Sequence, residues 1–115
     1  MKKIYKYEIK PNSVYNSHHP IVIDAPQGAK PIHIEGDFLW AEVETDNENA
    51  FQEVLVCVGT GHGVVPKGYT HFQSIIQIKK YTEETVQYVW HFYKKDESEL
   101  EALSLLNSKY IGQLR

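Results

Sequence analysis

The fold is decided by the stretch FQEVLVCV at residues 51–58, which runs directly into GTGHG at residues 59–63. The first eight residues are rich in β-branched and apolar side chains, which favour a pleated strand. Three glycines among the next five residues favour a loop, because glycine adopts backbone conformations that other residues avoid. We therefore predict a strand that ends at a glycine-rich loop.

Alternating apolar and polar residues predict further strands on both sides of this segment. They are expected over residues 3–10, 21–23, 32–34, 38–45, 73–79 and 86–94. Gly36 can take the positive φ of a tight hairpin turn between two of these strands. A polar tip at residues 81–85 joins the last two into a longer hairpin.

The chain after residue 95 has a different period. Asp96 and Glu99 have the spacing of a capping box, and leucines follow at helical intervals. We therefore predict a mainly β protein of the α+β class, with a compact antiparallel β-sheet or sandwich over residues 1–95 and a C-terminal α-helix over residues 96–115. The helix would pack on the sheet or on another subunit.

Charge and composition argue against several functions. The 115 residues carry a formal net charge of -3, so the chain lacks the basic footprint of proteins that bind long nucleic acids. No stretch approaches the ~18 apolar residues of a membrane span. The single cysteine, Cys57, allows no internal disulfide and lies in an apolar strand, where we expect an inert thiol. A reducing, cytoplasmic setting is favoured.

The glycine-rich loop is the strongest candidate for a binding site. Gly59, Gly61 and Gly63 let the backbone approach a ligand closely and direct N–H groups at an anion. Thr60 and His62 add side-chain donors. No helix is predicted after the loop, so it is neither a P-loop nor a dinucleotide fingerprint. A hairpin loop without a ligand is the alternative.

This candidate site is extended by three residues that follow the loop. Lys67, Tyr69 and His71 would place a cation, a phenol and a second imidazole beside His62, a set that suits a phosphorylated aromatic ligand. Each of them alone is also typical of a polar surface. The six histidines lack the spacing of a metal site, so we predict neither a bound metal nor a cofactor.

Flat rings on strands offer a way to hold a base. Tyr7 and Trp40 are candidates for stacking, because Trp40 alternates with acidic residues on the side of its strand that faces water. Trp90 lies between Val89 and His91 and is more typical of a core residue.

Several short motifs occur in order along the chain. They are KIYKY at residues 3–7, PQGA at 26–29, LWA at 39–41, VGTGH at 58–62, Pro66, Gln77 and VWHF at 89–92. Together they resemble a family of small phage-encoded proteins long labelled a domain of unknown function, over about residues 1–94. That family is in turn similar to the phage anti-CBASS sponges, which bind the cyclic dinucleotide signals of bacterial defence.

The resemblance implies a homo-oligomer, with a tetramer favoured over a dimer, in the cytoplasm of the infected bacterial host. It also implies ligand pockets at subunit contacts, a cyclic dinucleotide ligand such as 3′3′-cyclic GMP-AMP, and no turnover, so the protein would not be an enzyme. Tyr7 and Trp40 would stack on the purines, while Lys6 and Lys67 would supply charge. The residues expected to bind ligand are Lys6, Tyr7, Trp40, Gly59, Thr60, Gly61, His62, Lys67, Tyr69 and His71.

Two other functions remain open. One is a nucleotide hydrolase in which His62 pairs with His91 or His71 as acid and base. The other is a structural or protein-binding phage protein that uses the leucine-striped C-terminal segment. Gln77 and His91 would read base edges or satisfy buried polar groups.

Overall fold

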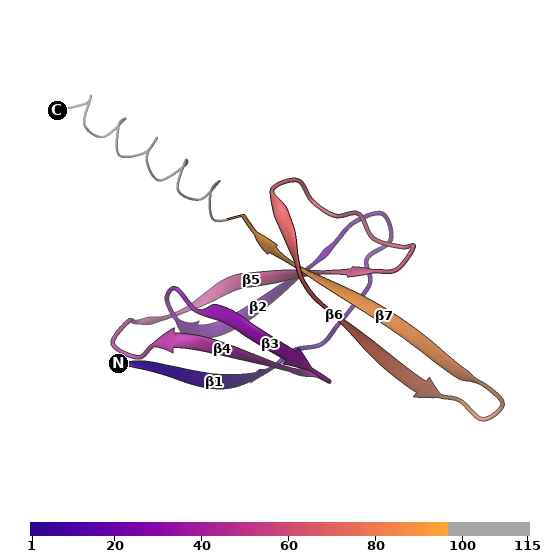
Figure 1. Cartoon of the computed structure of the whole chain (residues 1–115), viewed down its shortest axis with the longest axis horizontal. Helices are drawn as coiled ribbons and strands as arrows, with labels where there is room; N and C mark the ends of the chain where they lie inside the picture. Colours follow the sequence, from indigo (N-terminus) through magenta and orange to yellow (C-terminus); the bar gives the residue numbers. More distant parts are fainter. Residues whose placement is uncertain (97–115) are drawn as a thin grey trace.

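A computed structural model describes residues 1–96, which form seven β-strands in two antiparallel sheets (Figure 1). The strands are β1 (Lys2–Glu8), β2 (His19–Pro26), β3 (Lys30–Glu35), β4 (Phe38–Glu44), β5 (Asn49–Gly59), β6 (Tyr69–Lys80) and β7 (Thr85–Lys95). One sheet has three strands in the order β1-β4-β3, and the other has four in the order β2-β5-β7-β6.

The strands and hairpins predicted from the sequence are confirmed, and most strands are longer than expected. Gly36 has a φ of 59° between β3 and β4, as the predicted hairpin turn requires. In β4, Leu39, Ala41 and Val43 are buried on one face, and Trp40 lies on the opposite face, where it is half-buried. The alternation that predicted this strand therefore also gave its buried face.

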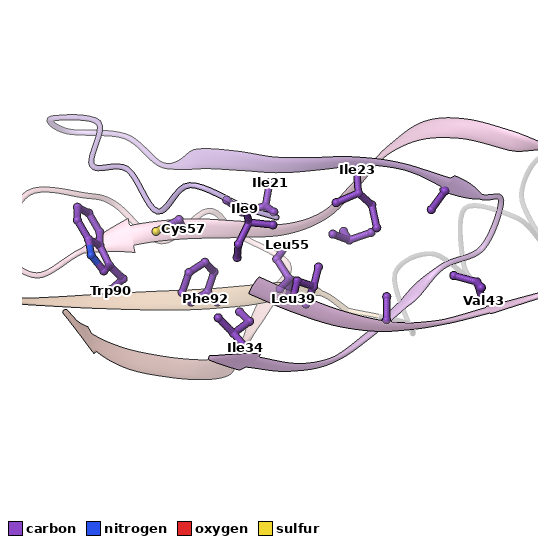
Figure 2. Close-up of a cluster of buried hydrophobic side chains, with 13 residues drawn as sticks. Ile9, Ile21, Ile23, Ile34, Leu39, Val43, Leu55, Cys57, Trp90 and Phe92 are labelled. Atoms are coloured by element: carbon purple, nitrogen blue, oxygen red, sulfur yellow. The ribbon is translucent and has the colours of Figure 1, made fainter. Parts of the chain in front are cut away.

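The core lies between the two sheets (Figure 2). Leu39 and Ile34 from the three-stranded sheet meet Leu55 and Phe92 from the four-stranded sheet. Cys57 is fully buried, so its expected place in the core is confirmed, and burial raises the pKa of its thiol to about 11. Trp90 is 8% exposed, which confirms it as a core residue.

The predicted α+β class is wrong. Residues 1–96 form strands and their connections, with no helix in that range. The physical reason is that two sheets already cover each other's apolar faces, so the core of this part needs no helix. The helix predicted over residues 96–115 lies outside the described residues except for Asp96, whose N–H donates to the carbonyl of Gly68 and whose carboxylate accepts from the Thr70 hydroxyl.

One hairpin extends beyond the two-layer body (Figure 1). β6 and β7 pair along their whole length, but β5 pairs with β7 only from Trp90 to Tyr93. We call residues 76–87 the arm, because no third strand pairs with this part of the hairpin. Ile76 and Ile78 in the arm are 62% and 60% exposed. Among the described residues there is also no helix that is long and apolar enough to span a bilayer.

Candidate functional site

The glycine-rich loop is held by a second loop from the N-terminal part of the chain. The N–H of Asn16 donates to the His62 carbonyl at 2.7 Å, and the N–H of Val64 donates to the Ser17 carbonyl at 2.9 Å. A Cβ added at Gly63 would lie 2.7 Å from the Ser17 carbonyl oxygen. The two loops therefore interlock through hydrogen bonds and a contact that only glycine permits.

Most backbone N–H groups of the loop already donate to carbonyl groups of the protein. The N–H groups of His62 and Gly63 donate to the Gly59 carbonyl at 3.3 and 3.2 Å, and that of Thr60 donates to the Val89 carbonyl at 3.4 Å. Gly61 has a φ of 75°, which closes this turn. Within residues 1–96 the N–H of Gly61 has no described acceptor, so the loop offers a single backbone donor where the sequence predicted several in a row.

A cleft of about 160 Å³ lies beside the loop, where β5 ends and β7 continues. Its lining residues are Ser13, Gly59, Thr60, His62, Gln87, Tyr88, Val89 and Trp90. The rings of Tyr88 and Trp90 are stacked, with centroids 6.0 Å apart and planes 12° from parallel. A hydrogen bond with Tyr81 raises the pKa of the Tyr88 phenol above its ordinary value.

Ser13 contributes an unpaired hydroxyl to the cleft. Its Oγ is buried and has no hydrogen-bond partner among the described residues. A Cβ added at Gly59 would lie 2.6 Å from this oxygen, so Ser13 can occupy this position only because residue 59 is glycine. A buried hydroxyl without a partner is costly to a folded protein, so this oxygen needs an explanation.

The cleft also exposes part of the backbone edge of β7. The Thr60 N–H and hydroxyl both donate to the Val89 carbonyl, which therefore points away from β6. Because backbone groups alternate along an antiparallel strand, the N–H and carbonyl of Gln87 face the same way. β5 ends at Gly59 and does not reach Gln87, so this peptide donor and acceptor are open to the cleft.

A row of hydrogen bonds crosses from the loop to β6 on the outer face of the four-stranded sheet. His91 Nε2 lies 2.7 Å from Thr60 Oγ1, and His91 Nδ1 lies 2.7 Å from Ser74 Oγ. Ser74 Oγ in turn lies 2.8 Å from His71 Nε2. Because the Thr60 hydroxyl donates to Val89, its oxygen accepts from His91 Nε2–H, which leaves His91 Nδ1 to accept from Ser74.

The structure brings some of the predicted ligand-binding residues together and separates others. Gly59, Thr60 and His62 line the cleft, Gly61 lies between them in the turn, and His71 is part of the hydrogen-bonded row. His62 packs edge-on against Tyr15, with ring centroids 6.0 Å apart. The rings of His71 and His91 are 6.5 Å apart. None of the three contacts of the row involves His62, so the row brings together neither of the predicted pairs, His62 with His91 or His62 with His71.

Lys67 and Tyr69 follow the loop but do not line the cleft. Lys67 is exposed. The Tyr69 hydroxyl donates to Glu53 at 3.0 Å, and its ring lies 6.5 Å from that of His18.

The remaining predicted residues lie on the three-stranded sheet. Lys6 is directly opposite Trp40 in the β1–β4 register, and its Nζ lies 4.7 Å from the ring centre of Phe38. Trp40 packs at a tilt against His33, at 6.0 Å. Tyr7 packs against the core, and this burial raises the pKa of its hydroxyl. None of these residues lines the cleft beside the loop.

Sequence reasoning missed four residues of the cleft, Ser13, Gln87, Tyr88 and Val89. It also missed Ser74 of the hydrogen-bonded row. The period-two pattern around Trp90 contained a signal for Tyr88, because residues two apart share a face of a strand.

Within residues 1–96 no three His, Cys, Asp or Glu side chains gather as a metal site would require. Gln77, whose role was open, accepts a hydrogen bond from the Trp90 indole at 3.0 Å.

The comparisons with known proteins give one result. A family model described as Domain of unknown function (DUF7352) matches residues 1–102. Comparisons with curated proteins and with solved structures give no match.

Proposed function

We propose that this protein, which belongs to the DUF7352 family, a domain of unknown function, binds a cyclic dinucleotide in the cleft beside Gly59 without converting it. The observation that carries the proposal is the meeting of a stacked aromatic pair, a glycine turn and an open backbone edge in one cleft. Each of the three features recognises a different part of a nucleotide.

The base is the part that the cleft fits best. Tyr88 continues the stack begun by Trp90 and offers its ring to a flat heterocycle, a contact worth about 1–3 kcal/mol per base. The N–H and carbonyl of Gln87 can pair with the edge of that base, as a neighbouring strand would. A purine, with a donor and an acceptor on adjacent atoms, matches this pair of groups.

The phosphate and sugar would lie at the loop. The Gly61 N–H, the His62 imidazole and the unpaired Ser13 hydroxyl supply donors to phosphate oxygens. None of the eight lining residues is Lys or Arg, so the lining supplies no permanent positive charge. Next to the lining, Lys79 Nζ lies 5.5 Å from the centre of the Tyr88 ring, and Lys67 follows His62 by five residues along the chain.

The size of the cleft bears on the oligomer. About 160 Å³ is smaller than the ~300–1,000 Å³ typical of small-molecule pockets, so one chain would enclose one nucleotide half of the ligand. The homo-oligomer implied by the sequence resemblance would then cover the other half. In the same proposal the protein is a phage immune-evasion factor in the host cytoplasm, where it withholds 3′3′-cyclic GMP-AMP from defence effectors. The motifs at residues 3–7 and 58–62 support this role.

The test is titration calorimetry with 3′3′-cyclic GMP-AMP, followed by heating and chromatography of the released ligand. We expect binding and recovery of intact ligand. Tyr88→Ala should weaken binding by about tenfold or more through loss of stacking. Tyr93→Ala, on the same strand but outside the cleft, is the matched control and should bind normally. Failure to bind any cyclic nucleotide in a panel would overturn the proposal, and loss of affinity in Trp40→Ala would move the ligand to the three-stranded sheet.

A hydrolase is the second candidate, and the hydrogen-bonded row supports it. The Ser74 hydroxyl donates to His91 Nδ1, and a serine that donates to a histidine is the core of many nucleophilic sites. Against it, the row lies on an exposed face, and the cleft is lined by neither Ser74 nor His91. If the wild type released linear nucleotide and Ser74→Ala did not, the protein would be a hydrolase and not a sequestering protein.

A further inference from the structure

The arm of the β6–β7 hairpin is incomplete as a structure in water. An isolated two-stranded hairpin is marginally stable, and a third strand or a covering layer is normally needed. The arm has neither, and its outer face presents Ile76 and Ile78, both more than half exposed. Figure 1 shows it projecting from the rest of the molecule.

The edge of β6 is open along the arm. The Tyr81 N–H donates to the Glu84 carbonyl at the tip, and pairing runs without a shift from Gln73 to Lys80. Alternation along the ladder then directs the N–H and carbonyl groups of Ile76 and Ile78 away from β7. No acceptor or donor for these groups is described within residues 1–96.

We propose that β6 pairs with β6 of a second copy of this chain, antiparallel and about a two-fold axis at Gln77. Such a dimer joins the two four-stranded sheets into one sheet of eight strands and removes the open edge. Ile76 then lies opposite Ile78 of the second copy, and the reverse pair forms on the other side of the axis. Four isoleucines gather on one face, and the outward backbone groups of all four are paired.

The charges of the arm fit this register. Lys80 lies opposite Ser74 of the second copy and Lys79 opposite Ile75, so no lysine faces another lysine. The tip, with Glu83 and Glu84, comes level with the start of the second copy's β6, where Thr70 pairs with Lys94 of β7 and its hydroxyl donates to Asp96. In this register the exposed isoleucines oppose each other and no lysine opposes a lysine, so the edge is complementary to itself, and this favours a second copy over an unrelated strand.

The inference does not depend on the proposed ligand. The cleft lies at the β5 side of β7, and the open edge lies on the far side of β6, so the dimer leaves the cleft accessible. Loss of the dimer and loss of nucleotide binding are separate results.

A disulfide test reads the register directly. Gln77 bonds inward to β7, so across the axis the two copies of residue 77 form a non-hydrogen-bonded pair, with Cα atoms about 4.5 Å apart. Gln77→Cys should therefore yield a covalent dimer under mild oxidation, because this spacing is within disulfide range. The native Cys57 is fully buried and does not interfere. Ile76→Cys is the control and should remain uncrosslinked; the opposite pattern, or no crosslink in either variant, overturns the proposed axis.

A second test removes one hydrogen bond from each side. Ile78→Pro deletes an N–H that points outward, so the pairing of β6 with β7 keeps its bonds. Analytical ultracentrifugation of the full chain should show a dimer for the wild type and a dissociation constant raised at least about tenfold in Ile78→Pro. A double Ile76→Lys, Ile78→Lys variant, which places charges on the edge, should weaken this dimer in the same way. A wild type that is monomeric at every concentration, or a dimer that survives both variants, overturns the inference.

Discussion

Gln73 binds both backbone groups of Ile34. Its Oε1 accepts from the Ile34 N–H at 2.9 Å, and its Nε2 donates to the Ile34 carbonyl at 2.6 Å. The side chain thus acts as one residue of a neighbouring strand and ties the edge of β3 in one sheet to β6 in the other. A register shift in β6 between His71 and Gln73 accompanies this arrangement.

Gln73→Ala should lower the free energy of unfolding by about 1–3 kcal/mol, because it leaves two partly buried backbone groups of Ile34 without partners. Urea unfolding followed by tryptophan fluorescence measures the change. Gln87→Ala, an exposed position on the same hairpin, should stay within about 0.5 kcal/mol of the wild type. Equal effects of the two changes would show that the bridge to Ile34 contributes nothing.

Gly59→Ala should destabilise the protein by about 1–3 kcal/mol, because the new methyl group would lie 2.6 Å from Ser13 Oγ. Removing that oxygen and its carbon in Gly59→Ala, Ser13→Gly should restore most of the loss. Thermal unfolding of the four proteins in this cycle gives the coupling between the positions. Additive effects would mean that the two residues do not touch.

The hydrogen-bonded row fixes the proton positions of its two histidines. His91 should carry its proton on Nε2, which donates to Thr60, and His71 should also be protonated on Nε2, because the single Ser74 proton is already given to His91. Long-range ¹H–¹⁵N NMR spectra at pH 8 distinguish the tautomers. An Nδ1-protonated His91 would contradict this order, and Thr60→Val should let His91 adopt both forms.

Cys57 should react with a thiol reagent at pH 8 only after denaturation. It is fully buried, and burial raises its pKa from an ordinary 9.0 to about 11, so little thiolate is present and none is accessible. Ellman's reagent with and without guanidinium measures this. Rapid labelling of the folded protein would show that β5 opens readily.

The same shift predicts a loss of stability in alkali. The neutral thiol is favoured in the folded state, so its contribution is complete below pH 9.0 and is lost as pH rises toward about 11. Cys57→Ala lacks this dependence, so the stability difference between wild type and variant should narrow across that window. A difference that is constant with pH would contradict the buried thiol.

The sequence predicted local structure well because local periodicity determines it. The alternation in β4 placed Leu39 and Val43 inside, and Gly36 marked the turn before it. The α+β class was wrong because it was inferred from the capping pattern that begins at Asp96. Residues 1–96 form a two-layer core with strands alone.

The composition of the cleft could not be predicted in the same way. Periodicity gives the face of a strand but not the sheet that the strand joins, so Trp40 and the glycine-rich loop were combined although they belong to different sheets. Ser13 lies in a loop without any pattern, and its position depends on the bonds between Asn16 and His62 and between Val64 and Ser17. Such pairings between distant segments carry no signal in a single sequence.

The cleft is built from segments around residues 13, 60 and 88, which are far apart along the chain. Their assembly requires the closure of long chain loops, which is slow, so we expect the cleft to form late in folding. A fragment shorter than residues 13–90 lacks at least one of its lining residues. Nascent or partly degraded chains that lack one of these segments should therefore not bind a ligand of the cleft. A bound ligand should also protect the folded protein against proteolysis.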